Sequence, residues 1–249
     1  MRSRTLTATS MAFTDQRRRP LLLILLVIVP AYVITRSVAI TEATPRRIPL
    51  PGHLTVTTTM KDLHGAVMAG IVIAFVASLC GVFVMQAALQ GDRRLVIAGY
   101  RPSETVLARL TVLAAATTLV VVISMAVTAA SFTPASWGPF ITAALLTGLT
   151  YAALGAIAGA ILDKLAATYL MLFLALTDLG IAQNPMFGNG SPRPWATLLP
   201  GYGPGRIMLD GAFSPSFHAN APLAITLAWT LALTLTVGAV LRRAVHTRN

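Results

Sequence analysis

Residues Gly65–Gly91 read GAVMAGIVIAFVASLCGVFVMQAALQG, a run without one charged side chain. An α-helix rises about 1.5 Å per residue, so about 20 apolar residues are enough to cross the hydrocarbon core of a bilayer. The run is long enough for such a crossing and contains no proline that would break a helix. It therefore predicts a membrane-spanning helix near residues 65–89.

Long apolar runs without charged side chains recur along the rest of the chain. Leu110–Leu162 also lacks charge, but it is too long for one crossing, and the prolines and small polar residues of Ser131–Pro139 predict a turn that divides it in two. The sequence thus predicts an all-α membrane protein, a single transmembrane domain over residues 1–249 with six transmembrane helices. The expected spans are about 21–40, 65–89, 106–131, 139–162, 165–182 and 221–241.

Composition agrees with a lipid-solvated protein. Hydrophobic residues make up 55% of the chain and charged residues 11%, whereas a soluble domain carries about 25% charged residues. The net charge is +11, and the basic residues gather at the ends of apolar runs, which favours anionic lipid headgroups over nucleic acid as a partner. A lone cysteine, Cys80, excludes an internal disulfide and a cysteine metal cluster.

The distribution of basic residues predicts the orientation. Segments 1–20, 90–109, 163–164 and 242–249 hold most of the 19 lysines and arginines, and such segments face the cytoplasm. Both termini are then cytoplasmic, as an even number of crossings requires. The preference for arginine over lysine, with abundant Ala, Gly and Pro, suggests a bacterial source. We therefore expect a multi-pass protein of a bacterial plasma (inner) membrane.

The inner segment between the second and third spans mixes charged and apolar residues. Charged Asp92–Arg94 precedes apolar Leu95–Ile97, Gly99 can end a helix, and Pro102 suits the first turn of a new one. The pattern predicts a short helix, a sharp turn and then span three. Such a helix could dock into a groove on a partner protein, or it could lie anchored in the headgroup region.

The outer segment 183–220 is rich in glycine and proline yet carries few charges. Trp195–Leu199 and Ile207–Leu209 are too apolar for a free loop. Irregular backbone at membrane depth has to be covered by protein, so this pattern predicts broken apolar helices that dip back into the membrane. A compact extracellular loop resting on the helix ends is the alternative.

Asp178 is the only acidic residue inside a predicted span. A centred Asp costs about 2.5–3.5 kcal/mol or more in lipid, so its side chain should face protein or water. The expected partners are Gln183, Asn184 and the donors of segment 193–206, including Arg206. These residues could hold an outer gate closed, or Asp178 could be a structural hydrogen-bond partner of the segment that follows it.

Span four carries small residues at spacings that place them on one helix face. Small side chains in this pattern allow a second helix to approach closely. The residues predicted to serve helix packing are Gly148, Ala152, Gly155 and Gly159.

No motif for hydrolysis or metal binding is found. Lys61 and Lys164 are the only lysines, and neither completes the G-x-x-x-x-G-K-[ST] phosphate-binding loop. H-E-x-x-H is absent as well. We therefore expect no catalytic residue, no metal site and no cofactor in this chain.

Several features of the sequence are typical of one family: the six spans, the 92–101 segment, the short turn at Asp163-Lys164 and the stretches Asp178–Phe187 and Leu199–Pro204. In these features the sequence resembles the permease subunits of ABC-2-type transporters, particularly small actinobacterial ones. The resemblance implies that two permeases, identical or paralogous, pair and dock onto two ABC ATPase subunits that bind ATP and Mg²⁺. It implies short re-entrant outer helices between spans five and six. It implies that the coupling residues are Asp92, Arg93, Arg94, Leu95, Val96, Ile97, Gly99, Tyr100 and Arg101.

The function expected from the resemblance is a permease subunit of an exporter for a lipid, a drug or another amphipathic substrate. Members of the family often begin with an amphipathic interface helix, but residues 1–20 show no clear apolar stripe. A secondary transporter would usually need more spans and inverted repeats, and no repeat is evident. A non-transporting membrane assembly subunit is a further alternative, whereas a membrane enzyme is disfavoured by the missing catalytic cluster.

Overall fold

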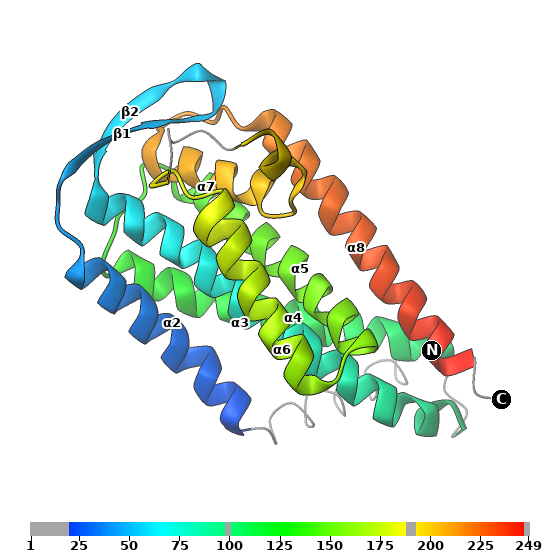
Figure 1. The fold of residues 1–249 in the computed structure, drawn as a ribbon. Helices are drawn as coiled ribbons and strands as arrows, with labels where there is room; N and C mark the ends of the chain where they lie inside the picture. Colours follow the sequence, from blue (N-terminus) through cyan, green and yellow to red (C-terminus); the bar gives the residue numbers. More distant parts are fainter. Residues whose placement is uncertain (1–19, 98–100, 188–192, 247–249) are drawn as a thin grey trace.

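The computed structural model describes residues 20–97, 101–187 and 193–246, which form a helical bundle with a β-hairpin at one end (Figure 1). The part of the chain expected to hold an N-terminal interface helix, residues 1–19, lies outside them. The α-helices are α2 (Pro20–Ile40), α3 (Met60–Ile97), α4 (Pro102–Ala129), α5 (Trp137–Ile161), α6 (Lys164–Ala175), α7 (Tyr202–Phe213) and α8 (Asn220–His246). The shorter elements are strands β1 (Pro45–Pro49) and β2 (Thr55–Thr59), 3₁₀ helices η1 (Pro51–His53) and η3 (Pro194–Leu198), and the π-helix η2 (Leu176–Ala182).

Five of the described helices are long and apolar enough to cross a membrane. They are Met60–Leu89, Ser103–Ala129, Trp137–Ile161, Lys164–Ala182 and Asn220–Arg243. The first predicted span, 21–40, corresponds to α2, within which Val27–Ile40 is a shorter apolar helix, and this crossing stays a prediction. The described chain is thus mainly helical and compatible with a multi-pass membrane protein. The predicted turn at Ser131–Pro139 separates α4 from α5.

The centre of the bundle is the crossing of α3 and α5. A Cβ placed on Gly155 would collide with the carbonyl oxygen of Ser78, and one on Gly81 would collide with that of Ala152. A Cβ on Gly159 would lie 2.9 Å from Val82 Cα. The missing side chains therefore let the two backbones touch, which increases van der Waals contact where lipid offers no hydrophobic drive.

One end of the bundle, here called the α7 end, gathers the hairpin, η3 and α7 (Figure 1). Strands β1 and β2 pair antiparallel from Pro45↔Thr59 to Pro49↔Thr55, and Gly52 takes a φ of 76° in the connection. Ile48 of β1 packs with Leu63 of α3 and Leu209 of α7 in one apolar cluster. The hairpin, which the sequence analysis did not foresee, is thereby fixed to the bundle.

The segment between the second and third spans differs from its prediction. α3 continues without interruption through Ile97, so residues 92–97 are its last turns rather than a separate short helix. Gly91, just before this stretch, is its weakest helix-forming neighbour, and a single glycine costs only about 1 kcal/mol in a helix. The start of α4 follows the prediction, since Pro102 occupies its first turn and the Arg101 backbone N–H donates to Glu104 Oε2 at 2.9 Å.

Candidate functional site

The carboxylate of Asp178 lies in the core of the α7 end, with 1% of the residue exposed. Its Oδ2 accepts hydrogen bonds from the Tyr151 hydroxyl at 2.6 Å and from the Gly201 backbone N–H at 2.8 Å. Its Oδ1 accepts from Gln183 Nε2 at 3.2 Å. Both oxygens are thus engaged by protein donors, which offsets part of the penalty of burying an acid.

A change of helix type brings Asp178 to this position. The fifth predicted span continues from α6 into the π-helix η2, in which the Gln183 N–H donates to the Asp178 carbonyl oxygen at 2.9 Å across five residues. π-helical turns are rare and are found frequently at functional sites. The wider turn places the side chains of Asp178 and Gln183 near each other, as their hydrogen bond shows.

The Asp178 network joins four elements at the α7 end. Tyr151 belongs to α5, Asp178 to η2, and Gly201 directly precedes α7, while Gln183 Nε2 also donates to the Ala196 carbonyl of η3 at 2.7 Å. A Cβ on Gly201 would lie 2.7 Å from the Asp178 carboxylate, so only glycine permits this approach. The network therefore holds the broken segment between η2 and α7 against α5.

The partners differ in part from those expected. Gln183 and a donor of segment 193–206, the Gly201 N–H, do bind Asp178. Asn184 instead turns back on its own segment, donating to the Gly180 carbonyl at 3.1 Å. Tyr151 was missed, although a tyrosine inside an apolar span is itself a signal, because its hydroxyl needs a partner when buried.

Arg206, expected beside Asp178, reaches in another direction. Its Nη1 donates to the Pro49 carbonyl at 3.3 Å and so connects α7 to the hairpin. Burial lowers the pKa of the Arg206 guanidinium, while the nearby acidic groups of Tyr202 and Asp210 act to raise it. Arginine stays protonated in proteins, so this position keeps its positive charge.

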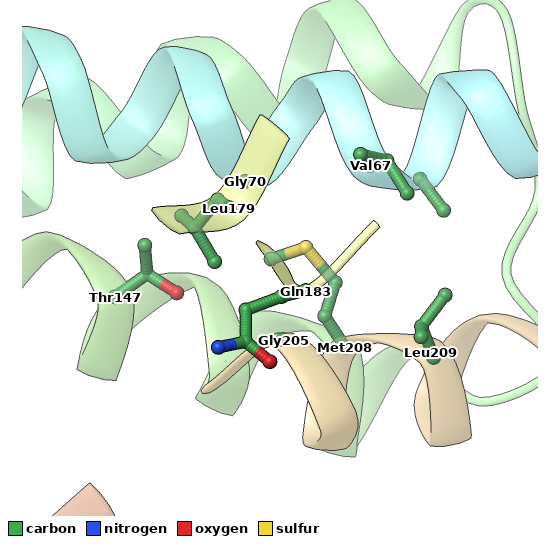
Figure 2. Close-up of a pocket in the computed structure, with 9 residues that line it drawn as sticks. Val67, Gly70, Thr147, Leu179, Gln183, Gly205, Met208 and Leu209 are labelled. Atoms are coloured by element: carbon green, nitrogen blue, oxygen red, sulfur yellow. The ribbon is translucent and has the colours of Figure 1, made fainter. Parts of the chain in front are cut away.

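A small cavity adjoins the network (Figure 2). It has a volume of about 20 Å³ and lies between α3, η2, α5 and α7. Gln183 and Thr147 are its polar lining residues, and the remaining lining residues are Ala66, Val67, Gly70, Leu179, Gly205, Met208 and Leu209. The cavity thus combines an apolar wall with two hydrogen-bonding side chains.

A second buried acid, Asp210 in α7, was not singled out by the sequence. It is 1% exposed, and its Oδ2 accepts from the backbone N–H groups of His218 at 2.7 Å and Ala219 at 3.2 Å, immediately before α8. Its Oδ1 lies 3.6 Å from His218 Nδ1 and has no hydrogen bond among the described residues. Asp210 thus satisfies free N–H groups at the start of α8, as capping residues do.

The remaining predicted residues lie outside this site. Gly155 and Gly159 are at the crossing with α3, whereas a Cβ on Gly148 would meet Thr117 of α4 at 2.6 Å. Asp92–Ile97 form the end of α3, Arg101 precedes α4, and Gly99 and Tyr100 are not among the described residues. The structure does not join these segments to the Asp178 network.

In the described part of the chain, no group of three or more His, Cys, Asp or Glu side chains could hold a metal ion. The arrangement offers hydrogen bonding and apolar contact rather than a nucleophile with a base.

No protein-family model matches the sequence, and no curated protein matches it at a significant level.

Proposed function

We propose that the chain is the permease subunit of an ATP-driven exporter and forms the translocation pathway for a lipid, a drug or another amphipathic substrate. The observation that carries the proposal is the arrangement of the elements at the α7 end. There, α7 is packed among helices of membrane length, and the buried acid Asp178 accepts from the residue before it. The short element η3, in which only Ala196 is buried, is joined to the same network through Gln183. This arrangement supports the re-entrant outer helices that the family resemblance implies.

The outward faces of the bundle support pairing with a second permease and with lipid. Large apolar side chains are exposed along α6 and α8, including Leu170, Phe173, Leu231 and Leu235. A soluble monomer rarely exposes contiguous apolar surface of this kind. In the proposed assembly, membrane lipids and a second permease copy or paralogue cover these faces.

In this proposal the energy for transport comes from ATP hydrolysis on a partner protein, because the sequence lacks a phosphate-binding loop. We propose that ABC ATPase subunits bind the cytoplasmic side at the end of α3 and the start of α4, where Asp92–Ile97 and Arg101 lie. A secondary transporter is less well supported. Asp178, the acid within the fifth predicted span, is enclosed by protein donors, whereas an ion-coupling carboxylate has to exchange its proton or ion.

The test is co-expression with candidate ABC ATPase subunits, sought first among the genes that neighbour this one, followed by purification and measurement of ATP turnover in proteoliposomes. The chain alone should hydrolyse no ATP, and the complex should hydrolyse it. The double substitution Arg93→Glu/Arg94→Glu should detach or uncouple the ATPase. Full transport-coupled turnover in that variant would refute the coupling assignment.

A matched control is Arg242→Glu/Arg243→Glu, at another pair of adjacent arginines on the same predicted side. Both double substitutions change the net charge equally, so any general effect on membrane orientation is shared between them. Only the Arg93/Arg94 pair should lower ATPase binding. Equal loss in both variants would show a topology defect rather than a lost docking contact.

A further inference from the structure

A second and much larger hollow, here called the Asp62 groove, lies at the α7 end. Its volume is about 630 Å³, and four parts of the chain border it: β2, the start of α3, the turn between α4 and α5, and the end of α7. It shares no lining residue with the Asp178 network. Small-molecule sites have volumes of about 300–1,000 Å³, so the groove has room for an organic ligand.

The polar side chains of the groove come from three of these parts. They are Thr58 of β2, Asp62 of α3, and Ser131 and Thr133 of the turn. None of the three hydroxyls forms a hydrogen bond with another described residue. Because a hydroxyl can both donate and accept, these groups are available to a polar ligand.

Among the described residues that line the groove, Asp62 is the only charged one. Its Oδ2 accepts from the Thr59 hydroxyl at 2.6 Å, and its backbone N–H donates to that hydroxyl at 3.1 Å, as at a capped helix start. No basic side chain in the described part of the chain forms an ion pair with Asp62. The capping contact thus uses one carboxylate oxygen and leaves the charge without a basic partner.

The C-terminus of α4 adds to the negative character of the groove. The backbone N–H groups of Ser131 and Phe132 both donate to the Thr128 carbonyl, at 2.9 and 2.8 Å. The carbonyls of Ala129 and Ala130, which line the groove, accept no backbone hydrogen bond from the described residues beyond the helix. The last carbonyls of a helix carry a partial negative charge, so they favour a cation, as the carboxylate does.

Two aromatic rings form the apolar part of the lining. Phe132 and Phe213 pack with their ring centroids 5.8 Å apart, and Phe132 is 7% exposed, so this wall is fixed in the core. A bare metal ion is less suitable here, because calcium takes several oxygen ligands and no group of three metal-binding side chains occurs among the described residues. A carboxylate beside an apolar wall suits an organic cation.

We propose that the Asp62 groove binds a small organic cation with several hydroxyl groups, whose ammonium pairs with Asp62 while its hydroxyls bond to those of the groove. The carboxylate and the end of α4 select the positive charge, and the unbonded hydroxyls match the polar part of the ligand. In the predicted orientation the groove opens to the outside of the cell. The site goes beyond the proposed transport function, because it involves neither an ATPase nor the Asp178 network.

The test uses the full chain in nanodiscs of phosphatidylcholine, a lipid without net charge, at neutral pH and low salt. The probes are glucamine and sorbitol, which differ only by an ammonium in place of one hydroxyl. Ligand-observed NMR titrations give the two values of Kd. One charge-assisted contact corresponds to about tenfold in affinity, so glucamine should bind about tenfold more tightly than sorbitol. High salt should reduce this difference, because it screens partly exposed charges.

Asp62→Asn tests the role of the carboxylate. The amide keeps an oxygen for the Thr59 hydroxyl and removes the charge, so the variant should bind glucamine and sorbitol equally. The matched control is Asp163→Asn. Asp163 also begins a helix, accepting from the N–H groups of Leu165 and Ala166 at 2.9 Å, but it lies outside the groove. This control should keep the full preference for glucamine.

Ala135→Trp tests the location. Ala135 is exposed and lines the groove, so an indole at this position occupies the groove without entering the core. Both probes should then lose most of their affinity. The control is Ala166→Trp, at an exposed alanine of α6 outside the groove, which should leave both values of Kd unchanged.

Three results would overturn the proposal. The first is equal affinity of the unchanged protein for glucamine and sorbitol, or no binding of either. The second is an undiminished preference for glucamine in Asp62→Asn, and the third is normal binding in Ala135→Trp, each of which would place the cation elsewhere. None of these measurements needs an ATPase partner, so the permease function and the groove can fail independently.

Discussion

Asp178 and Asp210 are both buried in the α7 end, yet their carboxylates are satisfied to different degrees. Asp178 receives three hydrogen bonds over its two oxygens, from a side-chain hydroxyl, a side-chain amide and a backbone N–H. Asp210 receives two backbone hydrogen bonds on one oxygen, while the other faces His218, whose side chain is 33% exposed. The first acid connects separate elements, whereas the second organises the start of one helix.

This difference separates two roles for a buried acid. Removing Asp178 leaves donors from α5 and from the residue before α7 without a partner in a closed core. Removing Asp210 leaves N–H groups beside a partly exposed loop, where water can replace the carboxylate. Substitutions at the two positions should therefore lower the stability of the protein by different amounts. The two Asp→Asn variants should also differ in which hydrogen bonds they lose.

The largest effect is expected from Asp178→Ala. The Tyr151 hydroxyl and the Gly201 N–H lose their acceptor, and each buried unsatisfied group costs about 1–3 kcal/mol, so the loss should be about 2–6 kcal/mol. Thermal unfolding in nanodiscs measures it as a lower melting temperature. The gate hypothesis makes the opposite forecast, namely a normal melting temperature with raised basal ATP turnover in the complex.

Asp178→Asn should have a smaller effect, about 1–3 kcal/mol. The amide oxygen can keep the bonds from Tyr151 and Gly201, but its nitrogen then faces Gln183 Nε2, and two donors oppose each other. Reversing the Gln183 amide only moves the conflict to the Ala196 carbonyl. A melting temperature equal to the wild-type value would show that the Gln183 bond contributes nothing.

Asp210→Ala should cost about 1–2 kcal/mol, the usual range for a lost capping interaction. The effect should be confined to the region before α8, where His218 and Ala219 lose their acceptor. Hydrogen exchange of the amides at 218 and 219 should rise, while the Gly201 amide stays protected. Faster exchange at Gly201 would contradict the separation of the two sites.

The smallest effect is expected from Asp210→Asn, a loss of about 0.5–1 kcal/mol. Its amide oxygen keeps both backbone bonds, and its nitrogen takes the place of an oxygen that accepts no hydrogen bond in the described structure. The informative measurement is the ratio between the two Asp→Asn effects on the melting temperature. A larger loss at Asp210 than at Asp178 would reverse the comparison.

Several features followed from the sequence alone, because they depend on local chemistry. Long uncharged runs at 65–89 and 139–162 predict helices of membrane length, since only internal hydrogen bonding satisfies a backbone in lipid. Proline at 102 and the prolines of Ser131–Pro139 mark helix boundaries through their own geometry. That Asp178 needs protein partners followed from the cost of a charge in lipid.

The identity of those partners required the tertiary structure. Tyr151 and Gly201 are distant from Asp178 in the chain, and no periodicity relates them to it. Arg206 was a reasonable partner by charge, but the packing of α7 against the hairpin turns it toward Pro49. The π-helical turn and the cavity beside Gln183 arise from how η2 and α7 meet α3 and α5, because long-range packing decides which donors reach which acceptors.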